Sequence, residues 1–449
     1  MKIRRLFVAN RGEIAVRILR TAKRLGIETV LGASDIDLDS VPARLADRCV
    51  RLGPSAAAKS YLDVAAVVGA ARSAGADALH PGYGFLSENS ALPRACELAG
   101  ITFVGPTAAT LDAVGDKLAA RRHAAGAGLP IVPGGEATSI DEAQAIARGT
   151  GWPILIKAVG GGGGRGLRRV DRAADLQSQL ELAITEANAA FADSRVYVER
   201  FVPQGRHVEV QILGDGQEVV HLGTRDCSVQ RRYQKLIEEA PAPLLPNGMA
   251  SRLMNDAVAL GRQLQFKGVG TVEFLVDGVR GEYYFLEVNA RIQVEHPVTE
   301  MVTGVDLVAE QLAVAAGVRL RDAHAQFAIR GHAIECRINA EDVSREFRPS
   351  PGRIVRALFP AGPGIRIDTH VQAGSVIPPF YDSLLAKIVV HAENRAAAVD
   401  RMSDALARCK IDGIAVNTAL HSQIVSDPEF RRGGVDTGFL GRLALAVAG

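Results

Sequence analysis

The chain has 449 residues, of which 47% are hydrophobic and 23% charged, with 52 Lys and Arg against 50 Asp and Glu. This composition is typical of a water-soluble globular protein, and the length is sufficient for two to four domains. The net charge of +2 excludes a nucleic-acid-binding surface dominated by charge. No apolar run approaches the roughly 18 residues of a membrane span, and the basic start is followed by too short an apolar stretch for a signal peptide.

The five cysteines are widely spaced and form no C-x-x-C pair. Such a pattern fits a reducing compartment and supports neither a disulfide framework nor a zinc site. We therefore expect a cytoplasmic protein that binds neither nucleic acid nor a membrane.

The first 115 residues alternate between strand and helix patterns. Buried strands are predicted at 6–9, 28–31, 76–79 and 101–104, and apolar residues recur at helical spacing from Ile14 to Leu25. This order predicts a parallel α/β domain. The loop 80–89, rich in Gly and Pro, follows a strand at its carboxyl end, where open α/β sheets bind ligands. A purely structural turn is the alternative.

Five consecutive glycines, 160–164, separate the strand-like runs 153–159 and 167–170. Because glycine has no Cβ, its backbone N–H groups can approach a phosphate closely, and Lys157 precedes them. The segment is therefore predicted to be a hairpin that closes over a nucleotide, with a flexible linker as the alternative. A helix over 115–128 precedes it, and residues 131–203 are predicted to form a compact α+β unit able to move as a lid.

Strands dominate from 208 to about 235, and a turn region at 240–246 and a helix at 249–265 follow. After about 330 the pattern changes to short β segments with Pro and Gly turns, and a helix near 395–409 is expected to close the chain.

A predicted hairpin joins strands 271–276 and 282–289. If its turn is symmetric about Arg280, Glu273 lies opposite Glu287. Two like charges so placed destabilise a sheet by up to about 1 kcal/mol, whereas a hard divalent cation would convert the repulsion into coordination. Asn289 shares the face of Glu287.

The same alternation continues through Arg291, Gln293 and Glu295. Arg291 could hold a planar carboxylate or bicarbonate through two parallel hydrogen bonds, and Glu295 beside that anion could remove its proton. For that task the pKa of Glu295 would have to be raised above its usual value of about 4.3. The alternative is the solvated face of an amphipathic strand.

With these residues in place, the chain resembles the biotin carboxylase family of the ATP-grasp superfamily over its whole length. The stretches that carry the resemblance are 8–15, 80–89, 157–166, 225–232, 238–241, 287–300 and 331–341. The resemblance implies an α/β and α+β protein with the ATP-grasp fold. It further implies a Rossmann-like N-terminal domain (1–115), an ATP-grasp domain (116–330) with a mobile glycine-hairpin lid (131–203), and a β-rich C-terminal lobe (331–446).

The implied reaction is ATP-dependent carboxylation of the N1′ nitrogen of biotin on a carrier protein. Bicarbonate attacks the γ-phosphate of ATP bound with Mg²⁺ or Mn²⁺, and biotin is carboxylated from the resulting carboxyphosphate. The residues that would contact ATP or line its pocket are Lys117, Lys157, Gly163, Gly164, Glu199, Arg200, Phe201, Val202, His207 and Gln230. The implied metal ligands are Glu273, Glu287 and Asn289.

The resemblance also implies roles in the chemical steps. Arg291, Gln293 and Val294 would hold bicarbonate, with Glu295 as its base. Lys235 would neutralise phosphate charge, and Arg337 would stabilise the biotin enolate. The resemblance also implies that Tyr83, in the 80–89 loop, is a ligand-binding residue.

Four positions depart from the family pattern. Tyr233 stands where many relatives carry histidine, Arg200 replaces a common lysine, and Val288 and Ala290 stand where methionine and proline or threonine are usual. No biotinyl segment follows within the chain, so separate carrier and carboxyltransferase polypeptides are expected, and the resemblance favours a homodimer. The expected context is acetyl-CoA carboxylase and fatty acid synthesis. Another split acyl-CoA or pyruvate carboxylase, or a different ATP-grasp ligase, remains an alternative.

Overall fold

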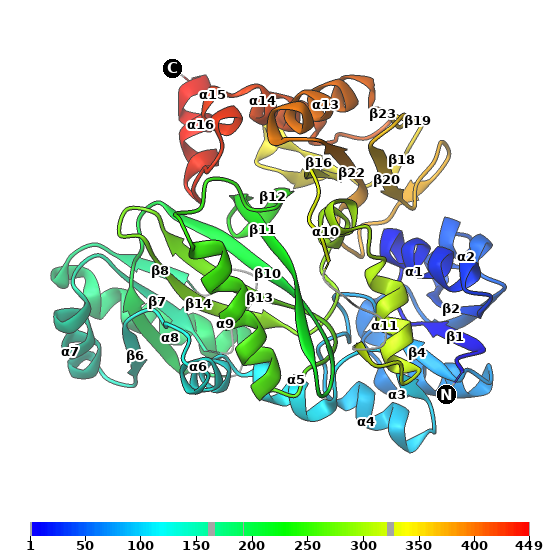
Figure 1. Cartoon of the computed structure of the whole chain (residues 1–449), viewed down its shortest axis with the longest axis horizontal. Helices are drawn as coiled ribbons and strands as arrows, with labels where there is room; N and C mark the ends of the chain where they lie inside the picture. Colours follow the sequence, from blue (N-terminus) through cyan, green and yellow to red (C-terminus); the bar gives the residue numbers. More distant parts are fainter. Residues whose placement is uncertain (1, 160–166, 192, 321–326, 449) are drawn as a thin grey trace.

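The computed structural model describes residues 2–159, 167–191, 193–320 and 327–448. The N-terminal domain is built on a five-stranded parallel sheet with strand order β3-β2-β1-β4-β5 (Figure 1). Its strands are β1 (Arg5–Val8), β2 (Glu28–Ser34), β3 (Arg48–Gly53), β4 (Ala78–His80) and β5 (Thr102–Phe103). Its helices are α1 (Gly12–Arg24), α2 (Val41–Leu45), α3 (Val64–Ser73), α4 (Ala91–Leu98) and α5 (Ala108–Gly115). The predicted parallel α/β arrangement is confirmed.

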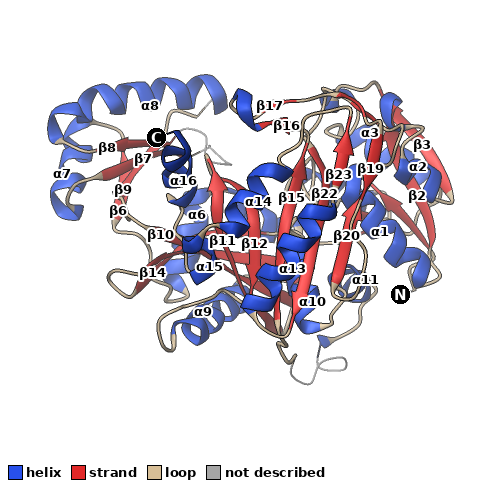
Figure 2. Ribbon diagram, turned by 90° about the horizontal axis from the view of Figure 1, so that it is seen from above, coloured by secondary structure: helices blue, strands red, loops and turns tan. Residues whose placement is uncertain are grey.

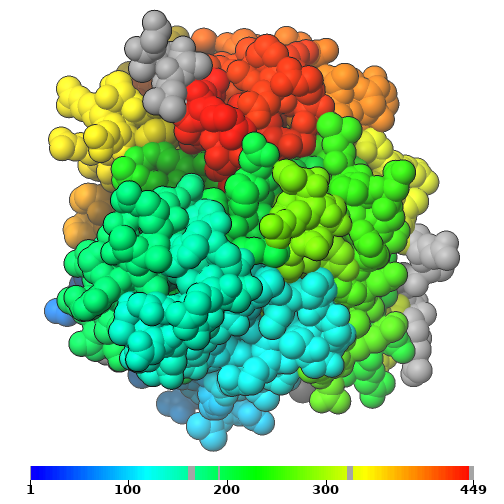
Figure 3. All heavy atoms as spheres, turned by 90° about the vertical axis from the view of Figure 1, so that its left-hand side faces the viewer, coloured from blue at the N-terminus to red at the C-terminus, as the bar shows by residue number. Residues whose placement is uncertain are grey.

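The predicted lid is an α+β unit with a four-stranded antiparallel sheet in the order β6-β9-β7-β8. Its elements are β6 (Gly134–Ala137), α7 (Ile140–Thr150), β7 (Ile154–Ala158), β8 (Leu167–Val170), α8 (Leu176–Phe191) and β9 (Val196–Arg200). Strands β7 and β8 pair antiparallel, as expected for the two arms of a hairpin. The glycines between them, including Gly163 and Gly164, lie outside the described residues. In Figure 3 this unit, in teal, occupies the face turned to the viewer, below the C-terminal helices.

An eight-stranded antiparallel sheet, in the order β14-β13-β10-β11-β12-β15-β22-β20, joins the middle of the chain to its C-terminal part. Its strands are β10 (Gly205–Asp215), β11 (Val219–Arg231), β12 (Gln234–Ala240), β13 (Lys267–Asp277), β14 (Glu282–Asn289), β15 (His332–Asn339), β20 (Ile365–Thr369) and β22 (Leu384–Ala392). The associated helices are α6 (Lys117–Gly126), α9 (Met249–Gln263), α10 (His296–Thr303) and α11 (Leu307–Ala315). Figure 2 shows this sheet running through the centre of the molecule.

The C-terminal part adds short strand pairs and four helices. The remaining strands are β16 (Glu341–Asp342), β17 (Arg348–Pro349), β18 (Gly352–Arg353), β19 (Arg356–Leu358), β21 (Val376–Ile377) and β23 (Lys410–Asp412). The helices are α13 (Arg395–Arg408), α14 (Thr418–Ser426), α15 (Pro428–Arg432) and α16 (Phe439–Ala448). The expectation that a helix near 395–409 closes the chain is therefore wrong. Ile424, Phe430 and Phe439 from the later helices pack into the same core as Met402 of α13, which explains why short helices persist there.

The carboxylate hairpin has the predicted pairing but reaches it by a different route. Asp277 pairs with Glu282 and Phe274 with Phe285, so the turn is not symmetric about Arg280. An extra residue at Leu286 forms a β-bulge, and beyond it Glu273 pairs with Glu287. The bulge therefore brings the two carboxylates opposite each other.

The predicted strand alternation beyond Asn289 is wrong. Strand β14 ends at Asn289, residues 290–294 form an irregular segment, and Glu295 directly precedes helix α10. Pro297 lies in the first turn of α10, where its missing N–H costs nothing. The residues expected on one strand face are thus carried by a bend, which gathers their side chains instead of spacing them along a sheet. Among the described helices, none is long and apolar enough to cross a membrane.

We expect Gly270→Ala to destabilise the protein. A Cβ at Gly270 would lie 2.3 Å from the ring of Phe266, which is fully buried in the core. Overpacking of this kind costs about 1–3 kcal/mol, so a thermal unfolding scan should show a lower Tm. Gly278→Ala is the matched control on the same hairpin, because a Cβ there meets nothing within 4 Å. Equal Tm values for the two variants would contradict the packing argument.

Candidate active site

One large cleft, with a cavity volume of about 1550 Å³, lies among the lid, the eight-stranded sheet, the N-terminal domain and the C-terminal part. The predicted site residues that line it are Tyr83, Lys117, Lys157, Glu199, Arg200, Phe201, Val202, His207, Gln230, Lys235, Glu273, Glu287, Asn289, Arg291, Gln293, Val294 and Arg337. Glu295 lies behind the cleft wall and is fully buried. The structure thus brings together every predicted site residue that it describes.

Three carboxylates form one row across adjacent strands. Glu209 of β10 pairs with Glu273 of β13, which in turn pairs with Glu287 of β14. On the other side Glu209 pairs with Arg225 of β11 and accepts a hydrogen bond from its Nε. Like charges on directly paired residues of neighbouring strands destabilise a sheet. This row of carboxylates therefore needs nearby positive charge to be stable.

Lys235 of β12 supplies that charge. Its Nζ donates to Glu209 Oε2 at 2.7 Å, to Glu273 Oε1 at 2.9 Å and to Glu295 Oε1 at 2.6 Å. An ammonium group has three N–H donors, so all three bonds can form together. Its environment raises the pKa of Lys235, because the nearby anions outweigh the effect of burial. The lysine is therefore held as a cation at the point where three acids converge.

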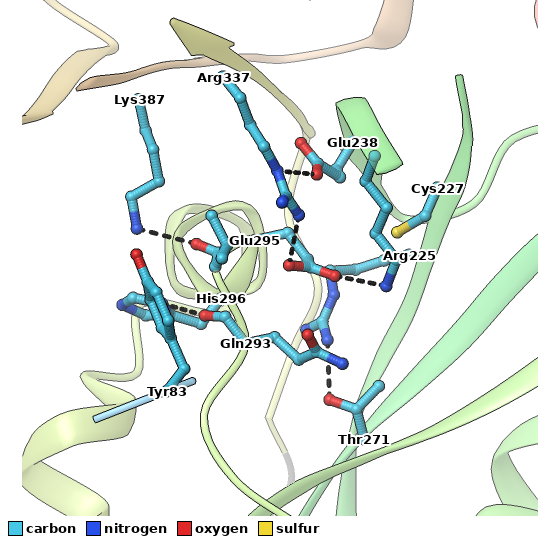
Figure 4. Close-up of polar contacts among 12 residues, drawn as sticks. Tyr83, Arg225, Cys227, Glu238, Thr271, Gln293, Glu295, His296, Arg337 and Lys387 are labelled. Atoms are coloured by element: carbon cyan, nitrogen blue, oxygen red, sulfur yellow. Dashed lines mark hydrogen bonds and ion pairs between the residues drawn. The ribbon is translucent and has the colours of Figure 1, made fainter. Parts of the chain in front are cut away.

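Glu295 accepts from two cations at once. Besides Lys235, Arg337 of β15 donates from Nη2 at 2.9 Å, and Figure 4 shows Arg337 pointing from its strand toward Glu295. Burial alone would raise the pKa of Glu295, but Lys235, Arg337 and Arg225 outweigh it and lower the pKa well below its usual value. The expectation of a raised pKa is therefore wrong for this state of the molecule, because charges invisible in the sequence surround the carboxylate.

Arg291 is fixed by side chains on three sides. It donates to Glu88 Oε2 at 2.9 Å, to Asn289 Oδ1 at 2.7 Å and to Gln293 Oε1 at 3.1 Å. The bend after β14 makes these contacts possible, since it folds Gln293 back toward the end of the strand. A guanidinium held in this way is pre-oriented to receive an anion from the cleft.

Glu273 and Glu287, although paired, have different environments. The pKa of Glu273 is lowered well below its usual value, since Lys235 and His207 outweigh the effect of burial, and His207 Nε2 lies 2.7 Å from its Oε2. Glu287 faces the cleft, and enclosure by the cleft walls and the charge of Glu273 raise its pKa. The Glu287 side chain makes no hydrogen bond to any described residue. Such a carboxylate, next to Glu273 and Asn289, fits a hard cation that would supply the missing positive charge.

Two lysines and an acid on α6 and the lid also line the cleft. Lys117 is the first residue of α6 and Lys157 lies on β7 of the lid, where its Nζ is 2.5 Å from Glu199 Oε1. Burial and Lys157 lower the pKa of Lys117, while Glu287 opposes the change. Lys117, at the start of α6, lies outside the lid, and Lys157 lies within it, so the two lysines reach the cleft from different elements, as expected of groups that share a polyanionic ligand.

Two of the departures from the family pattern, Tyr233 and Arg200, lie at the cleft. Tyr233 and Arg232 form the two-residue turn between β11 and β12, and both have positive φ angles of 68° and 46°. Tyr233 lines the cleft and is half exposed there. Arg200 donates to the Tyr284 hydroxyl, and its backbone N–H donates to Pro133 O at 2.9 Å.

Several residues of the site escaped sequence reasoning. Glu209 and Arg225 complete the carboxylate row, and Lys387 of β22 donates to the backbone oxygen of Val294 at 2.8 Å. Lys387 is fully buried and lies 3.1 Å from Glu13, which accepts from the Tyr83 hydroxyl. The alternation of polar and apolar residues from 207 to 212 could have indicated Glu209, but no short-range signal indicates Lys387.

Family models match nearly all of the chain. The biotin carboxylase N-terminal domain matches residues 2–111, the ATP-binding domain of the carbamoyl-phosphate synthase L chain matches 116–323, and the biotin carboxylase C-terminal domain matches 335–442. The biotin carboxylase of Nostoc is 48% identical over 98% of this chain and 99% of its own length. The chain belongs to the biotin carboxylase family.

Other relatives agree. The chloroplastic biotin carboxylase of Arabidopsis thaliana is 47% identical over 97% of this chain and 82% of its own length. Among solved structures, a biotin carboxylase from Campylobacter jejuni in complex with a β,γ-ATP ligand has a TM-score of 0.94 and 41% identity, covering 98% of this chain and 99% of its own. The biotin carboxylase domain dimer of the Hydrogenobacter thermophilus 2-oxoglutarate carboxylase, with MgADP, ADP and bicarbonate, has a TM-score of 0.93 and 42% identity, covering 98% of both chains. These matches establish the ATP-grasp architecture of the biotin carboxylases.

We expect Arg225→Met to be strongly destabilising. Arg225 is fully buried and donates to Gln211, Thr299 and Thr271 as well as Glu209. Breaking a buried ion pair from one side costs about 3–5 kcal/mol, which thermal or urea unfolding would detect.

Arg225→Met combined with Glu209→Gln should recover part of that stability, because no buried charge then lacks its strand partner. Arg169→Met is the surface control, since its pair with Asp171 is half exposed and worth about 0–1 kcal/mol. A loss for Arg225→Met no greater than for Arg169→Met would show that the row does not depend on this arginine.

Proposed function

We propose that this chain is a biotin carboxylase that uses ATP and bicarbonate to carboxylate the N1′ nitrogen of biotin on a carrier protein. The observation that carries the proposal is the convergence of Lys235 and Arg337 on Glu295, beside a cleft that Arg291, Lys117 and Lys157 also line. A base surrounded by cations suits an anionic substrate, and the separate pair of lysines suits a polyphosphate.

The nucleotide is proposed to lie along the lid side of the cleft. Lys117 and Lys157 would contact phosphates, with Gly163 and Gly164 closing over them. Glu199, Arg200, Phe201, Val202, His207 and Gln230 would line the adenosine pocket. The proposed domains are an N-terminal domain at 1–115, an ATP-grasp domain at 116–330 with its lid at 131–203, and a C-terminal domain at 331–446.

Glu273, Glu287 and Asn289 are proposed to hold Mg²⁺ or Mn²⁺. When bound, such an ion would neutralise phosphate oxygens during transfer of the γ-phosphoryl group. The protein contributes the position: Asn289 Nδ2 and Gln293 Nε2 both donate to Glu273 Oε1, at 2.9 and 3.1 Å, which fixes that carboxylate on the strand beside Glu287.

The first chemical step is proposed to occur at Arg291. Arg291, Gln293 and the backbone of Val294 hold bicarbonate, whose proton passes to Glu295 while one of its oxygens bonds to the γ-phosphorus and ADP leaves. The product of this step is carboxyphosphate. The low pKa of Glu295 keeps it ionised in the free protein. Its basicity rises when Lys235 turns to the phosphate and Arg337 to biotin, because each movement removes a cation from the carboxylate.

The second step places the carboxyl group on biotin. Carboxyphosphate gives up its carboxyl carbon to N1′, the phosphate leaves and takes the N1′ proton, and Arg337 neutralises the enolate oxygen that forms in between. Tyr83, held by Glu13, would border the biotin site. Lys387 supports this end of the cleft because it fixes the Val294 peptide.

The proposed partners are a biotin carboxyl carrier protein and carboxyltransferase subunits, with a second copy of this chain forming a homodimer. A relative of known structure is described as a dimer, which supports the last point. The proposed context is acetyl-CoA carboxylase. Relatives that belong to 2-oxoglutarate and pyruvate carboxylases share the same domain, so the acyl acceptor must be decided by the carboxyltransferase partner.

The direct test measures ADP release from purified protein with Mg-ATP and bicarbonate, with and without free biotin. We expect biotin to stimulate ADP release, and Glu295→Ala to abolish the stimulation. Nucleotide binding without any stimulation would favour a different ATP-grasp ligase.

We expect Glu287→Gln to lower kcat by about 10²-fold or more, because a neutral amide is a poor ligand for a hard cation. The Tm in the absence of metal should not fall, since the substitution removes a repulsive charge from the row. Mn²⁺ titration followed by electron paramagnetic resonance should show weaker binding. Wild-type turnover in this variant would rule out the metal assignment.

We expect Arg337→Ala to reduce biotin carboxylation by at least tenfold more than it reduces bicarbonate-dependent ATP hydrolysis. The reason is that Arg337 reaches the biotin side of Glu295, whereas Lys235 and Arg291 remain to serve phosphoryl transfer. Both rates can be followed in one coupled assay. Equal losses would contradict a role specific to biotin.

A further inference from the structure

Two buried glutamates behind Arg337 have no part in the mechanism above. Glu238 of β12 and Glu335 of β15 are both fully buried, and they stand directly opposite each other in the antiparallel register. Opposite residues of this kind have Cβ atoms about 4.5–5.5 Å apart on one face of the sheet. Two ionised carboxylates side by side in such a place are strongly destabilised unless cations neutralise them.

Most of the carboxylate oxygens of these two glutamates have no hydrogen-bond donor among the described residues. Glu238 Oε1 accepts from Arg337 Nε at 2.6 Å, as Figure 4 shows. Glu238 Oε2 and both carboxylate oxygens of Glu335 are buried without a donor among the described residues. Buried polar atoms are rarely left unpaired, so three such oxygens on facing carboxyl groups require an explanation. A proton on Glu335 that is shared with Glu238 Oε2 would satisfy two of them.

The surrounding charges do not offer another solution. Arg337 donates to Glu238 and Glu295, and Lys235 donates to Glu209, Glu273 and Glu295. Lys387 donates to the Val294 carbonyl and faces Glu13. The Cys227 thiol, on β11, stays un-ionised because burial raises its pKa. Each nearby cation is therefore directed at another group, and none in the described part of the chain forms an ion pair with Glu335.

The direction of the pKa shifts agrees with this geometry. Burial and the charge of Glu238 raise the pKa of Glu335 well above its usual value, although Lys387 opposes the change. Burial raises the pKa of Glu238 to about 7, against the influence of Arg337. Glu335, which has no ion pair among the residues that the structure describes, is the member of the pair that holds the proton more firmly.

We propose that Glu335 is protonated in the resting protein and donates a hydrogen bond to Glu238, so that the pair carries one negative charge and fixes Arg337 between Glu238 and Glu295. Both glutamates are positioning residues that act through Arg337. The proposal rests on the function proposed above only in the consequence for biotin, because the protonation itself is a property of the free protein.

The pair has a consequence for pH dependence. A group with a raised pKa keeps its proton at low pH and loses it as pH rises. Loss of the shared proton would place two anions beside Arg337 and draw its guanidinium away from the biotin side. Biotin-dependent turnover should therefore fall on the alkaline side, and replacement of Glu335 with an amide, which cannot ionise, should move that fall to higher pH.

The first test is spectroscopic and needs no substrate. The infrared spectrum of the free wild-type protein at pH 7, minus that of Glu335→Gln, should contain the carbonyl stretching band of an un-ionised carboxylic acid. The band should shift in D₂O, as an exchangeable acid proton requires. A difference spectrum that shows only carboxylate bands would overturn the proposal.

The second test compares Glu335→Gln with Glu335→Met, which have similar length and differ in the ability to donate a hydrogen bond. Glu335→Gln should keep biotin-dependent turnover within about threefold of wild type, while Glu335→Met should lose about tenfold or more, as expected when a hydrogen bond to a charged group is removed. Bicarbonate-dependent ATP hydrolysis without biotin should change less than threefold in both. Equal loss in the two variants would overturn the donor role.

If Glu335→Met does not fold, the pH profile of Glu335→Gln decides: an unchanged alkaline limb would contradict the proposal. These outcomes are separate from failure of the proposed function. Wild-type protein without any biotin stimulation would refute the function, while the infrared band would still report the protonation of Glu335.

Discussion

The row of carboxylates formed by Glu209, Glu273 and Glu287 is the constraint on which the rest of the site depends. Three acids side by side across neighbouring strands repel each other, and the sheet tolerates them only because Arg225 and Lys235 lie on one side and the cleft on the other. The charge is balanced at Glu209 and Glu273 but not at Glu287. The fold therefore presents an unbalanced negative charge to the cleft, where a divalent cation can bind.

The same balance of charge joins parts of the chain that are distant in sequence. Lys235 extends the row to Glu295, which precedes α10, and Arg337 extends it to the C-terminal strands. Lys387 then connects the Val294 peptide to Glu13 of the N-terminal domain. Every cation in this chain of contacts has more than one acidic or carbonyl partner. Arrival of an anionic substrate must therefore redistribute the cations, and such a redistribution can change the basicity of Glu295 during the reaction.

The sequence allowed much of this to be predicted, for reasons that are local. Alternation of strand and helix indicates the parallel N-terminal sheet, and the spacing of Glu273 and Glu287 about a short turn indicates their pairing. Arg291, Gln293 and Glu295 were found because polar residues recur at every second position, although the segment is a bend and not a strand. Pro297 could have indicated that a helix begins here, since proline in the first turn is typical of a helix start.

The features that could not be predicted from the sequence depend on how strands distant in sequence pair with each other. Glu209 faces Glu273 because β10 pairs with β13, although the two residues are about 60 positions apart in the sequence. Glu238 faces Glu335 at a separation of nearly 100 positions. No periodicity within one segment reports which strands become neighbours. The pKa of Glu295 could not be predicted for the same reason: reasoning from its function indicated an upward shift, whereas Lys235 and Arg337, both remote in sequence, impose a downward one.

In the proposed mechanism, bicarbonate attacks the γ-phosphate of ATP beside Arg291 and Glu295. This step can be tested with freshly dissolved ¹⁸O-labelled bicarbonate, Mg-ATP and free biotin, by mass spectrometry of the inorganic phosphate. Because the oxygen that bonds to phosphorus stays there when the carboxyl carbon is transferred, we expect one bicarbonate-derived ¹⁸O atom in each phosphate formed with carboxybiotin. Phosphate that acquires its new oxygen only from water, while ADP and carboxybiotin still accumulate, would contradict this mechanism.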